Sequence, residues 1–500
     1  MIRKINIIKT NLLAVILGII MLLIVISCGG GGKGGGIIPP VGGGGSGGSG
    51  GGGGNGGSSS SNISFNNEGY LIIETKNTSL NTDNLSFNFQ TSNPNILANQ
   101  NSEPIRNINN SFRRYKCGFI PSNKDQFNQN IYYSSTEPTV GSTRNFQVYD
   151  FSISNIVTVN AKCVYVNDST KYAIWVDTNN SDNFNEEQLF NDNSSNNNSS
   201  NITNRFNNDY NILTASPIGP LSFYVDVLIT EKVDSSSNPY VIGYFWGSQD
   251  PQRVNVHPFT FNLNYGDYNE FNVTLAHEFV HLLEFNKTSI GNHEAWIAEG
   301  LATYGEYLCG YAGDVRINSI ISFFNSPDTT PLVTDNPNFA NYGKSFLFIK
   351  QLDQRFTNAW ANMITSNLNG INLIENINGL EDFQTTVDKF NIAVLIDINN
   401  DDGTYDLRGF DLNSSTFNNG INRYNGWDDN KTLNQMGADN TMTRYSAYYL
   451  YKNSGFNGSI LVNNIQLLFT NFVDNIVGGW KIEYDDFDGN SNVRFIVVYK

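Results

Sequence analysis

Histidine is scarce in this chain, which has only four histidines among its 500 residues. Basic residues are also few: 30 lysines and arginines stand against 46 aspartates and glutamates, which gives a formal net charge of −16. Three of the basic residues lie within the first nine positions, so the rest of the chain is more acidic still. A protein that binds nucleic acid needs a basic patch or stripe to follow the phosphate backbone. The sequence has no such stripe, and this class of protein is excluded.

Cysteine is equally scarce, with four residues in the chain. Cys28 directly follows an apolar amino-terminal run. Cys117 and Cys163 fall in one expected β-rich region and could pair in an oxidising compartment, whereas in a reducing setting both stay free thiols. Cys309 is then left over. The sequence therefore predicts at most one disulfide, between Cys117 and Cys163.

The amino terminus has the pattern of a bacterial lipoprotein leader. A positively charged start is followed by an apolar run over residues 12–26, which is short for a membrane span and typical of a signal peptide. Residues 25–28, Val-Ile-Ser-Cys, match a lipobox, so cleavage would leave Cys28 as the lipidated first residue. We predict a signal peptide at residues 1–27 and a membrane-anchored, extracytoplasmic protein, at the cell surface or in the periplasm. A retained membrane anchor is the alternative.

Composition divides the rest of the chain. Residues 28–61 are almost all glycine and serine, which cannot bury a core and predict a flexible tether. Residues 62–170 alternate apolar and polar side chains in short runs, as in an antiparallel β-sandwich-like domain. Residues 171–400 join strand-like runs to several helical runs, with an Asn/Ser tract at residues 191–208 that predicts a disordered insertion. Residues 401–500 return to strand signals. The expected fold class is multidomain α+β, with a small carboxy-terminal β domain that packs on and supports the central domain.

Two of the four histidines stand four residues apart around a glutamate, in the run HEFVH. Apolar residues recur around this run at steps of three and four, which predicts an amphipathic helix: Phe271, Leu275, Phe279 and Leu282. His277 and His281 therefore lie on one helix face, where two neutral imidazoles can bind one zinc ion. Glu278 then directs its carboxylate toward a water molecule rather than toward the metal. The spacing predicts that zinc supplies the acidity and Glu278 the base.

A catalytic zinc ion needs a third protein ligand and an open position. Glu299 is a candidate, because it falls within a second helical run that begins near His293 and ends toward Gly310. The connection between the two helices is short, which makes them antiparallel neighbours. Glu294 and Glu306 on the same run are the rivals for the ligand position.

This arrangement resembles the gluzincin metallopeptidases, in which HExxH is followed by a glutamate on the next helix. The second motif is matched by six residues: Trp296, Ile297, Glu299, Gly300, Leu301 and Ala302. With the lipoprotein leader, the Asn-rich composition and the segment NYGKSFLFI, the closest resemblance is to the hyicolysin-like secreted metallopeptidases, over residues 220–400. The resemblance implies a zincin-type catalytic domain with a helical carboxy-terminal half, and one Zn²⁺ bound by His277, His281 and Glu299.

The resemblance also has departures. Thermolysin-type relatives carry an acidic residue four positions after the ligand glutamate to orient a ligand histidine, but this chain has Thr303 there. The GlyxMetGluAsn motif of aminopeptidase relatives is absent, which favours cleavage within chains. Tyr342 resembles the tyrosine with which those relatives stabilise the oxyanion, in a segment that keeps the lysine, Lys344, but not the following glycine. Simple packing of Tyr342 at a helix start is the other interpretation.

The remaining candidates have weaker patterns. His257 precedes a proline in an extended stretch and is interpreted as structural. His293 either caps or contacts substrate or is simply solvated, and the solvated state is expected. Glu306, seven residues after Glu299, either holds a ligand or is a surface carboxylate. Three Asp-rich stretches suit Ca²⁺ by residue type but lack the spacing of an EF-hand loop: residues 177–182, 397–402 and 485–488.

These patterns predict a zinc-dependent metalloendopeptidase that hydrolyses peptide bonds of extracytoplasmic proteins, with protein or peptide substrates and a membrane contact through lipidated Cys28. Glu278 would take a proton from water and pass it to the leaving amine, and Tyr342 would assist the oxyanion. Two alternatives remain. The first is a catalytically silent surface lipoprotein that acts in adhesion or binding, and the second is a zinc hydrolase whose substrate is not a peptide.

Overall fold

The fold contains both helices and β-sheets, as expected of an α+β protein. The computed structural model describes residues 63–91 except 66–68 and 77, 115–117, 137–180, 202–233, 240–257, 269–397 except 312–313, 378 and 380, and several shorter segments between 404 and 499. The signal peptide, the lipidated cysteine and the tether predicted before residue 62 lie outside the described residues. Within the described part, no helix has both the length and the apolar character needed to cross a membrane.

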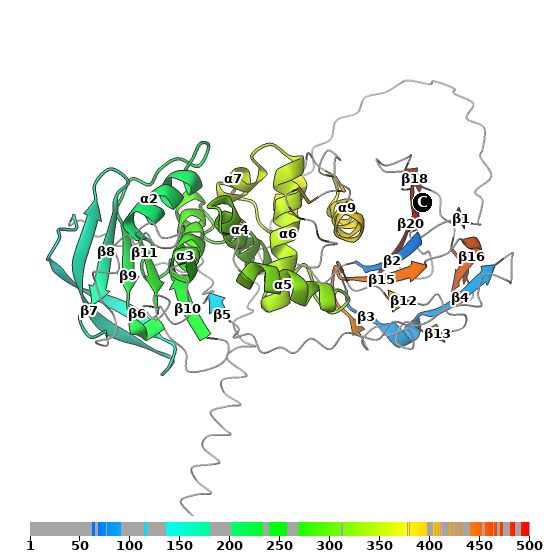
Figure 1. Ribbon diagram of the computed structural model, residues 1–500, viewed down its shortest axis with the longest axis horizontal. Helices are drawn as coiled ribbons and strands as arrows, with labels where there is room; N and C mark the ends of the chain where they lie inside the picture. The colour runs from blue at the N-terminus through cyan, green and yellow to red at the C-terminus, as the bar shows by residue number, and fades with distance from the viewer. Residues whose placement is uncertain are drawn as a thin grey trace, which may run out of the picture. The chain divides into compact units, whose positions relative to one another are not determined.

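A mixed seven-stranded sheet forms one half of the structure (Figure 1). Its strands run in the order β5-β10-β11-β9-β8-β7-β6, with parallel pairs at β5/β10, β11/β9 and β9/β8 and antiparallel pairs elsewhere. Their bounds are, in that order, Tyr115–Cys117, Tyr240–Phe245, Arg253–Val256, Val225–Ile229, Tyr172–Asp177, Asn155–Asn167 and Thr143–Asp150.

Both faces of this sheet are covered, and every residue of its strands β11, β9 and β8 is buried. On β8, Ile174 and Val176 face a core shared with the helices, whereas Ala173 and Trp175 face a second core on the opposite side. Two helices lie along the face that bears Ile174 and Val176 (Figure 1): α2 (Ile202–Leu213) and α3 (Asn269–Lys287).

Helix α2 corrects the expectation of a disordered tract at residues 191–208. Residues 202–208 belong to this helix, and residues 191–201 lie outside the described part. The ring of Phe206 meets Phe279 of α3 edge-on at 5.3 Å, and Tyr210 stacks on the same ring at 5.1 Å. The Asn-rich composition concealed an amphipathic pattern, since Ile202, Phe206 and Tyr210 recur at four-residue steps and, with Leu213, are buried in the core.

The helical run expected after the two motif helices is confirmed. It follows α4 (Ala295–Leu308), the second motif helix, and comprises α5 (Asp314–Asn325), α6 (Phe339–Arg355), α7 (Ala359–Ile364), α8 (Gly370–Ile377) and α9 (Phe383–Ile396). Helices α5 and α6 approach closely at Gly343, where a Cβ atom would lie only 2.4 Å from the backbone of Ser319. A side chain at position 343 would therefore push these two helices apart.

The other half contains a six-stranded sheet in the order β12-β15-β2-β20-β19-β18 and a smaller sheet in the order β1-β16-β4-β13, with β17 paired to β16. A short pair, β3 with β14, stands apart. The strands that precede residue 92 are β1 (Ile63–Phe65), β2 (Gly69–Thr75), β3 (Leu80–Asn81) and β4 (Ser86–Thr91). Those that follow residue 423 are β12 (Tyr424–Asn425), β13 (Lys431–Thr432), β14 (Thr441–Met442), β15 (Ala447–Lys452), β16 (Phe456–Val462), β17 (Ile465–Gln466), β18 (Asn471–Val473), β19 (Lys481–Asp485) and β20 (Val493–Tyr499).

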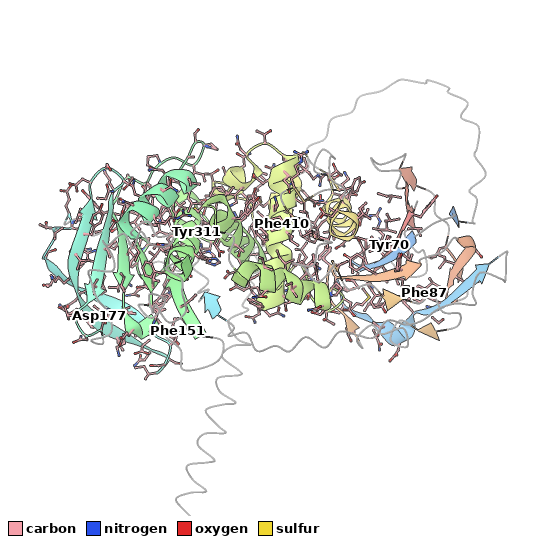
Figure 2. All side chains as sticks on the ribbon, viewed as in Figure 1. Tyr70, Phe87, Phe151, Asp177, Tyr311 and Phe410 are labelled. Atoms are coloured by element: carbon pink, nitrogen blue, oxygen red, sulfur yellow. The ribbon has the colours of Figure 1, made fainter. Side chains whose placement is uncertain are left out.

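These pairings correct the expected domain boundaries. The predicted β-rich domain at residues 62–170 is split, because its first strands pair with strands of residues 401–500 while β6 and β7 complete the seven-stranded sheet. The first and last parts of the chain therefore build one β unit together. Adjacent residues of β2 point to opposite faces: Tyr70 belongs to the core shared with the helices, and Leu71 to the core between the sheets, where Phe87 also lies (Figure 2). Such a split cannot be read from local alternation, which gives a strand's faces but not its partners.

The predicted disulfide is also corrected. Cys163 is a buried free thiol in β7. Cys117 ends β5, which lies five strand positions from β7 in the same sheet. Five strand spacings amount to roughly 24 Å, whereas the Cα atoms of a disulfide lie within about 7 Å of each other. Cys309, for which no partner was expected, is also a buried free thiol.

Candidate functional site

The two motif helices form an antiparallel pair, as expected. The contacts occur in reverse order along the two segments. His277 contacts Glu306, His281 contacts Glu299, and Glu284 contacts His293, just before α4. Four apolar side chains of α3, predicted to face inward, are fully buried: Phe271, Leu275, Phe279 and Leu282. The two helices therefore face each other through one row of polar side chains within an apolar interior.

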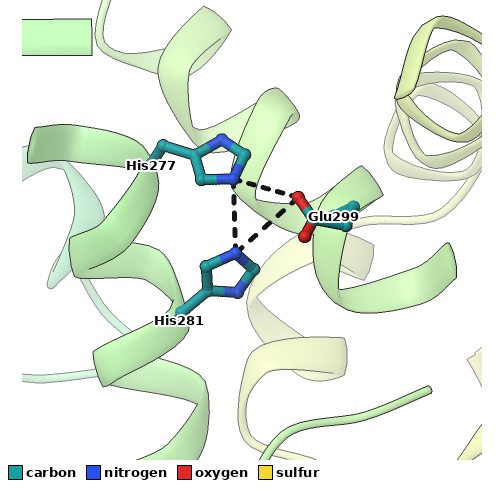
Figure 3. A group of neighbouring side chains, drawn as sticks. All are labelled: His277, His281 and Glu299. Atoms are coloured by element: carbon teal, nitrogen blue, oxygen red, sulfur yellow. Dashed lines mark hydrogen bonds and ion pairs between the residues drawn. The ribbon is translucent and has the colours of Figure 1, made fainter. Parts of the chain in front are cut away.

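Three side chains of this row lie close together (Figure 3). His277, His281 and Glu299 each offer a ligand atom, and the three atoms lie within 4.8 Å of one another. His277 Nε2 is 3.2 Å from His281 Nε2 and 3.1 Å from Glu299 Oε2, while His281 Nε2 is 3.8 Å from the same oxygen. All three side chains are buried. The structure thus brings together the predicted ligands and could hold a metal ion among them.

The donor atoms suit a small cation. Glu306 Oε1 lies 2.7 Å from His277 Nδ1, a position that favours the proton on Nδ1 and directs the Nε2 lone pair toward Glu299. Without a proton or a cation between them, that lone pair and the carboxylate repel each other. Ligands bound tetrahedrally to zinc at about 2.0–2.1 Å lie roughly 3.3 Å apart, close to the three spacings observed. The residues therefore fit a bound divalent ion.

Contacts within the cluster shift the pKa values of Glu299 and His281. Burial alone would raise the pKa of Glu299, but contacts with the two imidazoles outweigh it and lower the pKa to about 2. Burial likewise opposes the charge on His281, yet Glu284 and Glu299 raise its pKa to about 9. A metal ion bound by the group would supply the positive charge that these carboxylates favour.

Glu278 lies beside this group rather than within it. Its side chain is fully buried at the interface between α3 and β10. Gly243 of β10 permits this approach, because a Cβ atom there would lie 3.3 Å from Glu278 Cγ and 2.4 Å from Thr274 Cγ2. The carboxylate thus belongs to the helix that bears both histidines but is not one of the three grouped ligands.

Two further carboxylates contact the histidines, and the sequence indicated only one of them. Glu306, a rival for the ligand position, instead holds His277 Nδ1. Glu306 is thus placed to orient the His277 ring. Thr303 does not do so, because its hydroxyl donates to the Glu299 carbonyl oxygen at 2.8 Å. Glu284 has Oε2 at 3.9 Å from His281 Nδ1. Burial alone would raise the pKa of Glu284, but contacts with His293 and His281 lower it to about 2. Its spacing of three residues from His281 was the available signal.

Tyr342 lies over the same cluster. It stands in the first turn of α6, where Asn338 and Asn341 form a capping box. Its half-buried ring is nearly parallel to the imidazole of His277, with ring centroids 6.4 Å apart. Lys344 points elsewhere, because its Nζ donates to the carbonyl oxygens of Thr330 and Tyr445, each at 2.8 Å. The lysine of this segment is therefore a buried structural residue.

The other candidates fall outside the ligand group. His293, expected to be solvated, is buried, with Nδ1 2.7 Å from Glu284 Oε1, so that expectation is wrong. Glu294 directly precedes α4 and accepts from Trp296 Nε1 at 2.8 Å. His257 is buried at the end of β11, where burial lowers its pKa to about 4 against the opposing effect of Glu231. Its interpretation as structural agrees with this position.

The calcium prediction falls partly on residues outside the described part, which include 181–182, 398–403 and 486–488. Two described carboxylates of these stretches accept hydrogen bonds within the protein. Asp177 accepts from Thr230 Oγ1 at 2.8 Å, and Asp397 accepts from the backbone N–H of Leu412 at 2.8 Å. Both carboxylates therefore stabilise the local structure through hydrogen bonds.

Comparisons with known proteins add no relative. No family model matches the sequence, and no curated protein matches it. The resemblance to the gluzincin and hyicolysin-like peptidases therefore stays a prediction from the motif residues. The geometry shows that a buried group of His277, His281 and Glu299 could hold a metal ion.

The buried lysine predicts a pH dependence of stability. Burial lowers the pKa of Lys344 to about 7, although Glu74 and Asp328 oppose the shift. In the unfolded chain a lysine keeps its proton up to about pH 10.4, so between these values the unfolded state binds more protons. The free energy of unfolding should rise with pH in this window, by up to about 1.4 kcal/mol per unit from this group. In denaturant unfolding, the stability of the wild type should rise relative to that of Lys344→Gln from pH 7 upward; a constant difference contradicts this assignment.

Proposed function

We propose that the protein is a zinc-dependent endopeptidase of the gluzincin type. The observation that carries the proposal is the buried group of His277, His281 and Glu299, which converge from two adjoining helices with Glu278 next to the first histidine. Two imidazoles and one carboxylate are the protein ligands of a catalytic zinc site, and thiolates, which mark structural zinc sites, are absent from this group.

The residues around the group divide the reaction among them. His277, His281 and Glu299 would hold the ion, and a bound zinc ion supplies Lewis acidity that polarises a carbonyl oxygen and lowers the pKa of a water molecule. Glu278 would accept one proton from a water molecule, whose oxygen would bond to the carbonyl carbon of the peptide. The carbon–nitrogen bond then breaks, and Glu278 passes the proton to the departing nitrogen. Atoms and charge balance without a further reactant.

Tyr342 is suited to assist the negative charge that develops on the carbonyl oxygen. It reaches the cluster from α6, a third element, and its half-buried ring faces His277. A phenol fixed by a capped helix start can donate to a developing oxyanion without reorganising. The proposal therefore assigns Glu278 and Tyr342 to catalysis and the two imidazoles with Glu299 to the metal.

The compartment and the substrate class belong to the same proposal. The leader and lipobox support an extracytoplasmic protein anchored through Cys28, and the glycine-rich tether would let the folded part reach proteins away from the bilayer. The missing aminopeptidase motif supports cleavage within chains.

Glu278→Gln provides the direct test of the enzyme. The variant should lose peptide hydrolysis by about 10²- to 10⁴-fold, because an amide cannot take the water proton, and it should still bind zinc. Casein or gelatin hydrolysis is measured for the full chain before and after chelation and zinc replacement, with Glu294→Gln as the matched control outside the ligand group. A wild type without hydrolysis, or one whose hydrolysis survives both chelation and this substitution, contradicts the proposal and leaves an adhesion or binding lipoprotein.

Tyr342→Phe tests the oxyanion role separately. Loss of one donor to the oxyanion lowers kcat by about 10²- to 10³-fold in known cases, and we expect such a decrease with KM little changed. Tyr304→Phe removes a phenol that donates to Asp353 within the core and serves as the control. Steady-state kinetics with a fluorogenic peptide distinguish the two. An unchanged kcat for Tyr342→Phe would show that the ring only packs.

A further inference from the structure

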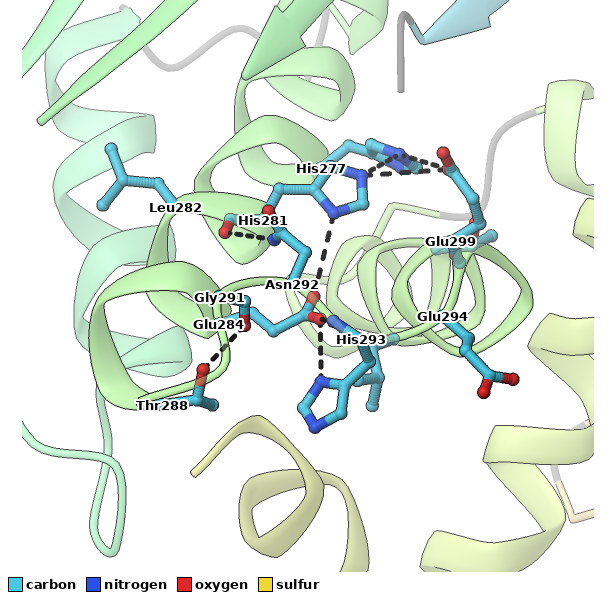
Figure 4. Close-up of polar contacts among 12 residues, drawn as sticks. His277, His281, Leu282, Glu284, Thr288, Gly291, Asn292, His293, Glu294 and Glu299 are labelled. Atoms are coloured by element: carbon cyan, nitrogen blue, oxygen red, sulfur yellow. Dashed lines mark hydrogen bonds and ion pairs between the residues drawn. The ribbon is translucent and has the colours of Figure 1, made fainter. Parts of the chain in front are cut away.

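Glu284 is a fully buried carboxylate that the proposed reaction does not use. It follows His281 by three residues on α3 and therefore lies on the same face of the helix. One oxygen, Oε1, accepts hydrogen bonds from both the backbone N–H and the Nδ1 of His293, the latter at 2.7 Å (Figure 4). The other oxygen, Oε2, lies 3.9 Å from His281 Nδ1. A single carboxylate thus faces a metal ligand and the residue that leads into α4.

The second oxygen is not satisfied by the protein as it stands. Glu284 Oε2 is buried and has no hydrogen-bond partner among the described residues. Leaving a buried carboxylate oxygen unsatisfied is costly. The His281 ring already presents Nε2 to the ligand group and Nδ1 to Glu284 Oε2. Ligand histidines almost always donate their second nitrogen to such a partner.

The loop between the helices is held against the same helix. Asn292 Nδ2 donates to the His281 carbonyl oxygen at 2.9 Å, and Thr288 Oγ1 donates to the Gly291 carbonyl oxygen at 2.6 Å. His293 then brings the chain to Glu284, two residues before α4 begins and six before Glu299. The contact between His293 and Glu284 therefore lies at the start of the helix that carries the third ligand.

We propose that Glu284 is a positioning residue for the metal group, which orients the His281 ring through Nδ1 and fixes the start of α4 through His293. It thereby sets the separation between the helix that carries both histidines and the helix that carries Glu299. Glu306 orients only His277, so the two carboxylates have complementary tasks. This inference rests on the proposed function only in requiring that the group binds zinc.

Zinc affinity tests the inference without any assay of activity. The dissociation constant of the full chain for zinc is measured by competition with a chromophoric chelator, for the wild type and Glu284→Gln. Loss of a partner that orients a ligand weakens metal binding by about 10- to 100-fold, and we expect a change in this range. Asp353→Asn is the control, because it alters a carboxylate that accepts from Tyr304 and Trp360 in the same helical region, away from the ligand group. This control should bind zinc as the wild type does.

A pair of variants at His293 keeps the test decisive if Glu284→Gln fails to fold. Asparagine places an N–H donor where histidine has Nδ1, so His293→Asn should retain wild-type zinc affinity, whereas His293→Leu should lose about as much as Glu284→Gln. Visible absorption of the cobalt-substituted protein should change for Glu284→Gln and His293→Leu but not for Asp353→Asn. Wild-type zinc affinity in both Glu284→Gln and His293→Leu would overturn this inference but not the proposed function. A wild type that binds no zinc would overturn the proposed function and the inference with it.

Discussion

The structure depends on holding three ionisable side chains together in an apolar interior. His277, His281 and Glu299 meet within 4.8 Å, and each is almost completely inaccessible to solvent. Such groups are expensive to bury unless their charges are compensated. Here Glu284 and Glu306 contact the two imidazoles, and in the proposed function a divalent ion balances the negative charge of the carboxylates. The apolar faces of α3 and α4 exclude the water that would otherwise screen these charges.

The two sides of the group are supported by different sheets. Helix α3, with both histidines, lies on the seven-stranded sheet. Helix α4, with Glu299, packs against α6, where Trp296 meets Phe348, and α6 packs against α9, where Phe348 meets Phe390. Helix α9 in turn is tied to the six-stranded sheet by the ion pair of Arg494 with Asp388 and by further hydrogen bonds. The β unit formed by the first and last strands therefore stabilises the helix that presents the third ligand.

The sequence predicted the local parts of this arrangement and missed the distant ones. The spacing of His277 and His281, the apolar positions of α3 and the place of Glu299 on the next helix follow from helix geometry, and the structure confirms them. The pairing of β2 with β20 joins residues more than 400 positions apart, and strand alternation carries no information about such partners. The buried state of His293 was missed for a similar reason, since only the folded loop brings it to Glu284.

X-ray absorption at the zinc edge of the zinc-loaded chain tests the central claim most directly. The account predicts one zinc ion per chain with only nitrogen and oxygen neighbours at about 2.0–2.1 Å, and multiple-scattering features of two imidazoles. Sulfur neighbours at about 2.3 Å, or a spectrum without imidazole scattering, would contradict a zinc site built from His277, His281 and Glu299.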